Sequence, residues 1–148
     1  MEQTLKTIHG SNILVMGFGR IGKILAKMLH GIGANVYCEA RKDSDIAWIE
    51  AYGYKKIHLR NLKENVDKFD IIINTIPSMI LDRVYLTKIN KDCLILDLAS
   101  DPGGVDREYA KENGIKVIWA LSLPGKVAPV TSAEYIKNTL YNVFQELD

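Results

Sequence analysis

The sequence predicts a three-layer α/β fold in which a doubly wound parallel sheet of six strands carries helices on both faces. Two observations predict it: a short apolar run recurs six times along the chain, and segments with helical apolar spacing lie between these runs. Several runs are continuous rather than alternating, which is typical of parallel strands covered on both faces. The 148 residues suit one domain, residues 1–148.

The six apolar runs are the expected strands. In chain order they are Ile13–Met16, Val36–Cys38, Ile57–Leu59, Ile71–Ile73, Leu94–Leu98 and Val117–Leu121.

Helices are expected between these strands. After the first strand, five apolar residues spaced i, i+3, i+4, i+7 and i+8 form one stripe of an amphipathic helix: Ile21, Ile24, Leu25, Met28 and Leu29. Gly31 and Gly33 end that helix. Shorter helices are expected over Ser44–Tyr52, Leu62–Val66 and Asp106–Asn113, the last ended by Gly114.

Both ends of the chain also have helical patterns. Thr131 and Glu134 fit a capping box that opens a closing helix. The apolar face of this helix consists of Ile136, Leu140, Val143, Phe144 and Leu147. That face is suited to packing against the sheet, against an absent domain, or against a second copy of the chain in a homo-oligomer. Residues 1–9 are weakly helical and fit the end of a connector from a missing domain.

Composition excludes several classes of protein. The 47% hydrophobic and 25% charged residues are ordinary for a soluble globular chain. The net charge of +1 gives no reason to expect nucleic acid or an anionic membrane as a partner. No apolar run approaches the roughly 18 residues of a membrane span, and no secretory segment is recognisable. Cys38 and Cys93 have no metal-ligand spacing, so we expect no metal and two reduced, buried thiols in a cytoplasmic protein.

The segment after the first strand matches G-x-G-x-x-G and opens the first helix. It comprises Gly17, Phe18, Gly19, Arg20, Ile21 and Gly22. Gly17 permits the tight turn, Gly19 lets a pyrophosphate approach the backbone, and Gly22 permits close packing of helix on strand. The helix N-terminus offers free N–H groups to the phosphates. In this context the motif predicts a Rossmann-like site for a dinucleotide.

The end of the second strand selects the dinucleotide. An NAD site places an acid there, about 20 residues after the glycines, but this chain has Ala40 followed by Arg41. Arg41, Lys42 and Ser44 suit a 2′-phosphate, so the sequence favours NADP(H), with NAD as the alternative. Glu39 lies one position early and would point to the opposite side from Ala40, unless a one-residue shift lets it bind the ribose.

Small, polar turns after the later strands form the other half of the expected cleft. They could line the nicotinamide ribose and ring, and the last of them could dock the carboxamide. The residues chosen for this role are Thr75, Ile76, Pro77, Ala99, Ser100, Leu123, Pro124, Gly125 and Val127.

No catalytic residue is identified. His9, His30 and His58 all have simpler structural explanations, and Asp97 is equally suited to bonding neighbouring amides. One nucleotide-binding domain cannot supply the wall that holds a substrate. The sequence therefore predicts half of an active site.

Several blocks spread over nearly the whole chain resemble the dipicolinate synthase family, in the nucleotide-binding part of its A-type subunit. They are 8–11, 17–22, 40–41, 74–81, 97–104 and 123–129, of which Asn-Thr-Ile-Pro-Ser and Pro-Gly-x-Val-Ala-Pro are the most specific. Glu39 departs from that pattern, because a small residue is common at its position.

The resemblance implies an NAD(P)-dependent oxidation of dihydrodipicolinate, a small dicarboxylate, to dipicolinate during sporulation. It also implies an N-terminal domain absent from this chain and a partner, the flavoprotein-like B-type subunit of dipicolinate synthase. Two alternatives are a dehydrogenase like those for methylenetetrahydrofolate, suggested by Pro124-Gly125 with Pro129 and Thr131, and a non-catalytic sensor of redox nucleotides.

Overall fold

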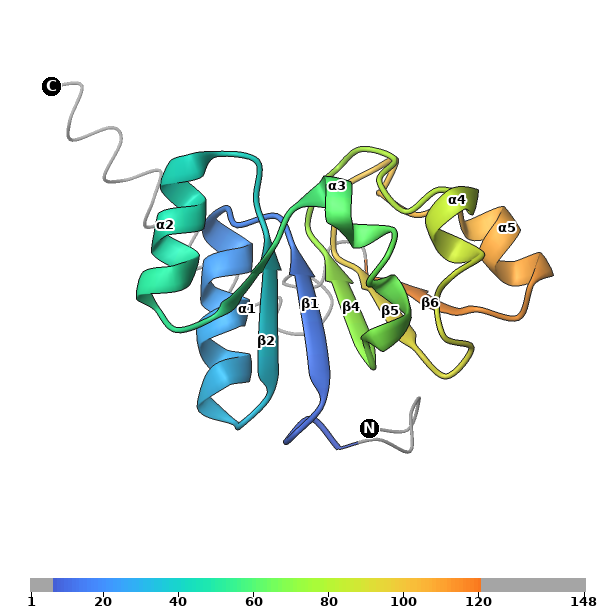
Figure 1. Cartoon of the computed structure of the whole chain (residues 1–148). Coiled ribbons are helices and arrows are strands. Elements are labelled where there is room, and N and C mark those ends of the chain that lie inside the picture. The colour runs from blue at the N-terminus through green and yellow to red at the C-terminus, as the bar shows by residue number, and fades with distance from the viewer. Residues whose placement is uncertain (1–6, 121–148) are drawn as a thin grey trace, which may run out of the picture.

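A computed structural model describes residues 7–120 of the chain. It confirms the α/β fold with a parallel sheet of six strands (Figure 1). The strand order is β3-β2-β1-β4-β5-β6, and each neighbouring pair is parallel. The strands are β1 (Asn12–Met16), β2 (Asn35–Glu39), β3 (Lys55–Ile57), β4 (Ile71–Asn74), β5 (Leu94–Asp97) and β6 (Lys116–Trp119). The order reverses between β1 and β4, so a crevice is expected at the carboxyl ends of these two strands.

Helices cover both faces of the sheet (Figure 1). On one face lie α1 (Arg20–Gly31) and α2 (Asp43–Ala51). On the other lie α3 (Leu59–Leu62), the 3₁₀ helix η1 (Val66–Lys68), α4 (Arg83–Leu86) and α5 (Arg107–Glu112). Within residues 7–120, no helix has the length and apolar character needed to cross a membrane.

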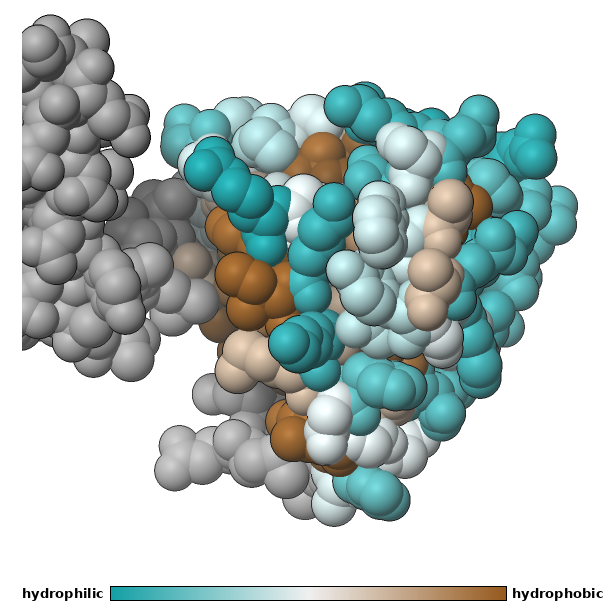
Figure 2. Space-filling view, turned by 90° about the vertical axis from the view of Figure 1, so that its left-hand side faces the viewer, coloured by the Kyte–Doolittle hydropathy of each residue, from teal (hydrophilic) through white to brown (hydrophobic). Residues whose placement is uncertain are grey.

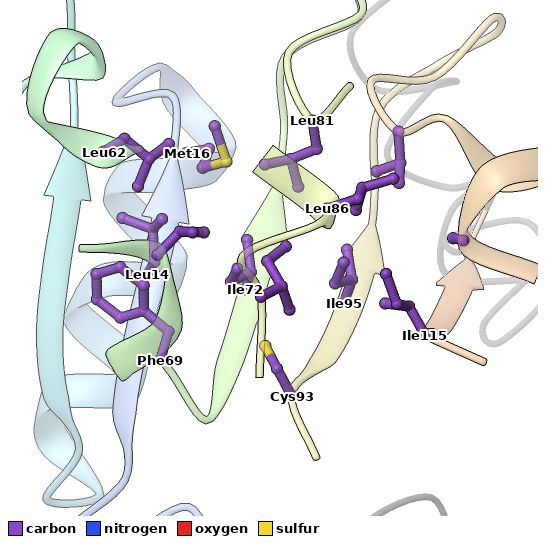
Figure 3. Close-up of a cluster of buried hydrophobic side chains, with 14 of the residues drawn as sticks. Leu14, Met16, Leu62, Phe69, Ile72, Leu81, Leu86, Cys93, Ile95 and Ile115 are labelled. Carbon is purple, nitrogen blue, oxygen red and sulfur yellow. The ribbon is translucent and has the colours of Figure 1, made fainter. Parts of the chain in front are cut away.

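Each face of the sheet has its own hydrophobic core. Figure 3 shows the core beneath α3, α4 and α5, where side chains from β1, β4 and β5 meet those from the covering segments. Leu14, Ile72 and Ile95 contribute from three adjacent strands and are fully buried. Alternate residues of the same strands, such as Ile13 and Val15, enter the core beneath α1 and α2. This two-sided burial explains the continuous apolar runs of the sequence.

The region between β2 and β4 differs from the prediction. The expected strand Ile57–Leu59 is placed two residues too late in the sequence. The strand β3 occupies Lys55–Ile57, and Leu59 already begins α3. The expected helix Leu62–Val66 is replaced by α3 and the separate turn η1. Leu62 and Val66 are both fully buried, so their helical spacing reflects two short turns that bury one residue each. The helix α4 is an addition that the sequence did not predict.

The apolar stripe predicted for α1 is only partly its packing face, because Leu25 and Leu29 pack against the core and the other three residues do not. Ile21, Ile24 and Met28 are more than half exposed, whereas Leu29 is buried. Figure 2 views the side of the molecule that carries α1 and α2, and hydrophobic residues are visible there among hydrophilic ones. The helix instead turns Gly22 and Ala26 to the sheet. Small residues are needed on that side because the helix lies very close to the turn that precedes it.

The two cysteines do not form a disulfide and both are buried, as expected. Burial raises the pKa of Cys38 from its ordinary value of 9.0 to about 12. A thiol with this pKa has a thiolate fraction about three orders of magnitude smaller than a solvent-exposed one, and the thiolate is the reactive form. We therefore expect neither cysteine to react with iodoacetamide in the native protein. Mass spectrometry after guanidinium unfolding should find both cysteines alkylated, and rapid native labelling of Cys38 would contradict its burial.

Candidate functional site

The turn between β1 and α1 is tightly packed. Gly17 has a positive φ of 87°, and its N–H donates to the carbonyl oxygen of Glu39 at 3.2 Å. A Cβ on Gly22 would lie 1.9 Å from the carbonyl oxygen of Gly17. The Thr75 hydroxyl donates to the carbonyl oxygen of Met16 at 2.9 Å, which joins the loop after β4 to the same turn. The turn can therefore form only with glycine at positions 17 and 22.

The N-terminus of α1 is open. Gly19 is its N-cap, and among the residues that the structure describes no side chain caps the helix and no atom lies within 4 Å of the position a Cβ of Gly19 would take. The first N–H groups of a helix have no intrahelical acceptor, and they carry a partial positive charge. This 12-residue helix thus presents uncapped donors to a space that admits an anion.

A cavity of about 210 Å³ lies against this turn. Its lining joins the glycine turn to the end of β2, the start of α2 and the loop after β4. The lining residues are Gly17, Phe18, Gly19, Glu39, Ala40, Arg41, Lys42, Asp45 and Ile76. Seven of them belong to the site predicted from the sequence. Arg41 and Lys42 are exposed, so their cationic groups are accessible to a ligand.

Some predicted residues do not line the cavity. Ser44 is exposed in the first turn of α2, and Arg20 and Ile21 are exposed in the first turn of α1. Pro77 and Ser100 are exposed in the loops after β4 and β5. Leu123, Pro124, Gly125 and Val127, together with the closing helix, lie outside the described residues.

Glu39 and Asp45 are the two lining residues that were not among the predicted site residues, and Glu39 is the buried one. It is 1% exposed, and within residues 7–120 neither carboxyl oxygen has a hydrogen-bond partner. Burial raises the pKa of Glu39, while the nearby Gly17 N–H, Arg41 and His58 oppose that rise. The sequence shows the position of Glu39, an acid next to the expected ribose position at the end of an apolar run, but not its burial.

A buried polar pair, Asn74 and Asp97, holds the loops after β4 and β5 in place. The carboxylate of Asp97 accepts hydrogen bonds from the Asn74 amide at 2.9 Å, the Ala99 N–H at 3.2 Å and the Gly104 N–H at 2.9 Å. Asn74 in turn accepts from the N–H of Ile76 at 3.1 Å and donates to its carbonyl at 3.0 Å. Both side chains are fully buried. Asp97 therefore positions the loops and is not free for proton transfer.

The three histidines lie outside the lining of the cavity. The Nδ1 atom of His9 lies 3.3 Å from the carbonyl oxygen of Ile32, and the His30 ring packs edge-on against Tyr54. His58 precedes α3. None of the three lines the cavity. A larger cavity of about 440 Å³ runs along α5 and β6, and it contains none of the predicted site residues.

Comparison with known proteins agrees with this geometry. Residues 2–148 match the family described as alanine dehydrogenase/PNT, C-terminal domain. The chain is 44% identical over 147 residues to the A-type dipicolinate synthase subunit of Bacillus subtilis, and the match covers 99% of this chain and 50% of that protein.

Two solved structures are similar over nearly the whole chain. The crystal structure of the same Bacillus subtilis protein has a TM-score of 0.94 at 45% identity, covering 98% of this chain and 49% of that one. Its counterpart from Bacillus halodurans has a TM-score of 0.91 at 34% identity, covering 96% and 49%. The chain thus spans about half the length of these relatives, and the resemblance recognised in the sequence is confirmed.

Proposed function

The chain belongs to the alanine dehydrogenase/PNT C-terminal domain family, and from this premise we propose that it is the coenzyme-binding half of an NADP-dependent dipicolinate synthase. The observation that carries the proposal is the open, uncapped N-terminus of α1 beside a cavity that ends at Arg41. Oxidoreductases of this fold bind a nicotinamide dinucleotide across the crevice where the strand order reverses.

The glycine turn fits the pyrophosphate. A side chain at Gly19 would project into the open space above the helix N-terminus, so glycine there leaves the N–H groups accessible to phosphate oxygens. The adenosine half would then extend toward the ends of β1 and β2, where the cavity lies. Thr75, Ile76, Ala99 and Ser100 follow β4 and β5 and would border the nicotinamide half.

Arg41 and Lys42 support a 2′-phosphate in the cavity. Both follow the end of β2, where an NAD site has its acid, and Arg41 can hold a phosphate through two parallel hydrogen bonds. The side chain of Ala40 has no acceptor for a ribose hydroxyl. NADP(H) is therefore the proposed coenzyme, which supplies the acceptor of the hydride.

The proposed substrate is dihydrodipicolinate, by likeness to the relatives of this chain. Its conversion to dipicolinate removes one hydride, which passes to the nicotinamide, and one proton, which passes to a base. A second domain would bind the two carboxylates, since the described residues contain no wall opposite the cavity. We also propose that the protein acts in the cytoplasm during sporulation. Its proposed partner is the flavoprotein-like B-type subunit.

Arg41→Ala tests the 2′-phosphate site. We expect NADPH affinity to fall by about 10- to 100-fold, because a charge-assisted bidentate contact is lost, while NADH affinity changes less than about twofold. Fluorescence titration of both coenzymes at one pH measures the two constants. Arg60→Ala, an exposed arginine of α3 outside the cavity, is the matched control and should match the parent chain.

An activity assay distinguishes an enzyme from a non-catalytic sensor, and it requires the domain that would bind the substrate. Mixing this chain with the other half of the Bacillus subtilis relative should give NADPH formation from NADP⁺ and dihydrodipicolinate, while this chain alone should give none. Parent preference for NADH would reject the coenzyme assignment. Coenzyme binding without turnover in the reconstituted pair would favour the sensor.

A further inference from the structure

The outward face of α1 and α2 concentrates exposed apolar side chains. Within residues 7–120, eight large hydrophobic residues are exposed, and six of them belong to these two helices or directly follow α1. The six are Ile21, Ile24, Met28, Ile32, Trp48 and Tyr52. Among the helices described on the other face of the sheet, only α4 carries such a residue, Val84. The two faces of the protein therefore differ in what they present to their surroundings.

The apolar residues of this outward face are connected. Ile21, Ile24 and Met28 follow one another along α1 at spacings of three and four residues, which places them in one row. A groove of about 340 Å³ joins Ile24 of α1 to Tyr52 at the end of α2. The Tyr52 ring stacks on Trp48, with centroids 5.5 Å apart. Single apolar residues are normal on a protein surface, whereas a contiguous patch marks a site of association.

The residue types of this face are those of protein–protein interfaces. Trp, Tyr and Met are enriched in interfaces, and Trp and Tyr supply much of the binding energy. A row of apolar residues at spacings of three and four is also the pattern by which one helix packs on another. Lys23 and Lys27 border the groove, so an apolar centre has a charged rim. The face therefore fits a partner that presents helices.

The charges of the two helices indicate which partner fits. The helix α1 contains Arg20, Lys23 and Lys27 and no acidic residue. The helix α2 contains three acidic residues and no basic one, and these are Asp43, Asp45 and Glu50. The two helices are adjacent, since Lys23 and Asp45 lie 3.4 Å apart. A surface with a basic half and an acidic half is complementary to a copy of itself, because a two-fold rotation can place each basic helix against the acidic helix of the other copy.

We propose that this face is a two-fold interface between two copies of the chain, in which α1 of each copy packs against α2 of the other. The apolar row of α1 then lies across the groove of the second copy, and Lys27 faces the acidic helix of that copy. Every contact occurs twice in such an interface. The inference goes beyond the proposed function, since it concerns the outward side of α1 and not the cavity at its N-terminus.

Sedimentation velocity from about 1 to about 200 µM chain tests the interface. We expect the parent to reach twice the mass of one chain within this range. Ile24→Gln and Trp48→Gln should each raise the dissociation constant at least about tenfold, and the double variant should remain monomeric. Glutamine favours a helix at least as well as isoleucine or tryptophan, so the monomer stays folded, and thermal unfolding verifies this. Val84→Gln makes the same kind of change on the opposite side of the sheet and should dimerise as the parent does.

A second pair of variants tests the pairing of α1 with α2. Lys27→Glu places an acid opposite the acidic helix of the other copy and should weaken dimerisation about tenfold. Lys88→Glu makes the same change in net charge at an exposed residue just after α4, and it should leave the dissociation constant within about twofold of the parent. Equal dissociation constants for these two variants would overturn the proposed pairing.

Other occupants of this face give different results, and each overturns the proposal. A parent chain that stays monomeric throughout, with Ile24→Gln lowering its thermal stability, would show that the chain covers this face itself. A monomeric parent that binds the other half of the Bacillus subtilis relative, and loses this binding in Ile24→Gln, would assign the face to that half. A double variant that dimerises as tightly as the parent would place the contact between copies elsewhere.

Discussion

Gly22→Ala is expected to lower the free energy of unfolding by about 3 kcal/mol or more and to abolish coenzyme binding at micromolar concentrations. The added Cβ would lie 1.9 Å from the carbonyl oxygen of Gly17, and this neighbour is backbone that cannot rotate away. Either α1 moves off β1, which uncovers Ala26 and Leu29, or the turn opens. Both changes displace the N–H groups at the start of α1. Urea denaturation and NADPH titration measure the two effects.

Gly31→Ala is the matched control in the same helix. No atom of residues 7–120 lies within 4 Å of the position its Cβ would take, and its φ is not positive. Alanine is the better helix former by about 1 kcal/mol, so this variant should be as stable as the parent or slightly more stable. If Gly22→Ala were equally stable, the close approach of α1 to its turn would not exist in solution.

The sheet was predictable because burial on both faces leaves a strong signal. Continuous apolar runs such as Ile71–Ile73 are too short for helices and too apolar for loops, and their alternation with helical segments gives the topology class. The segment 55–68 was not predictable in detail. There the chain makes only single turns, so spacing between buried residues such as Leu62 and Val66 does not follow one helix.

The orientation of α1 was misread for a physical reason. Apolar spacing identified a stripe containing Ile21, Ile24 and Met28, which are exposed. The face of α1 that packs on the strand is determined by how closely the backbones can approach, and not by which face is most apolar. The side with Gly22 and Ala26 permits the closest approach, so it faces the sheet. The glycine motif already contained this information, since its third glycine is the one that packs against the strand.

The parts of the site that depend on backbone geometry were predictable from the sequence. The parts that depend on side-chain burial were less predictable. Gly17 and Gly19 follow from a motif in its context, and Arg41 follows by counting from it. The sequence places Glu39 at the end of the second strand, but only the structure shows that its carboxyl is buried and, among residues 7–120, without a hydrogen-bond partner.

Asp97→Asn is expected to destabilise the chain by about 3 kcal/mol, the second large effect. The Asp97 carboxylate accepts three hydrogen bonds from N–H groups, through both of its oxygens, in a fully buried place. An amide has one acceptor oxygen, so its NH₂ group would face an N–H donor of Asn74, Ala99 or Gly104. Urea denaturation measures the loss, and Asp92→Asn, an exposed aspartate in the turn before β5, should change stability by less than about 0.5 kcal/mol.

The same substitution should also reduce coenzyme affinity, because Asp97 holds Asn74 and Asn74 holds the backbone of Ile76. Ile76 lines the cavity, and Gly104, the third partner of this network, accepts the N–H of Leu81. Loss of one buried acceptor therefore loosens the loop after β4 at the edge of the site. We expect the folded fraction of Asp97→Asn to bind NADPH about tenfold more weakly. Unchanged affinity in a destabilised variant would show that these buried bonds support the fold without positioning the loop.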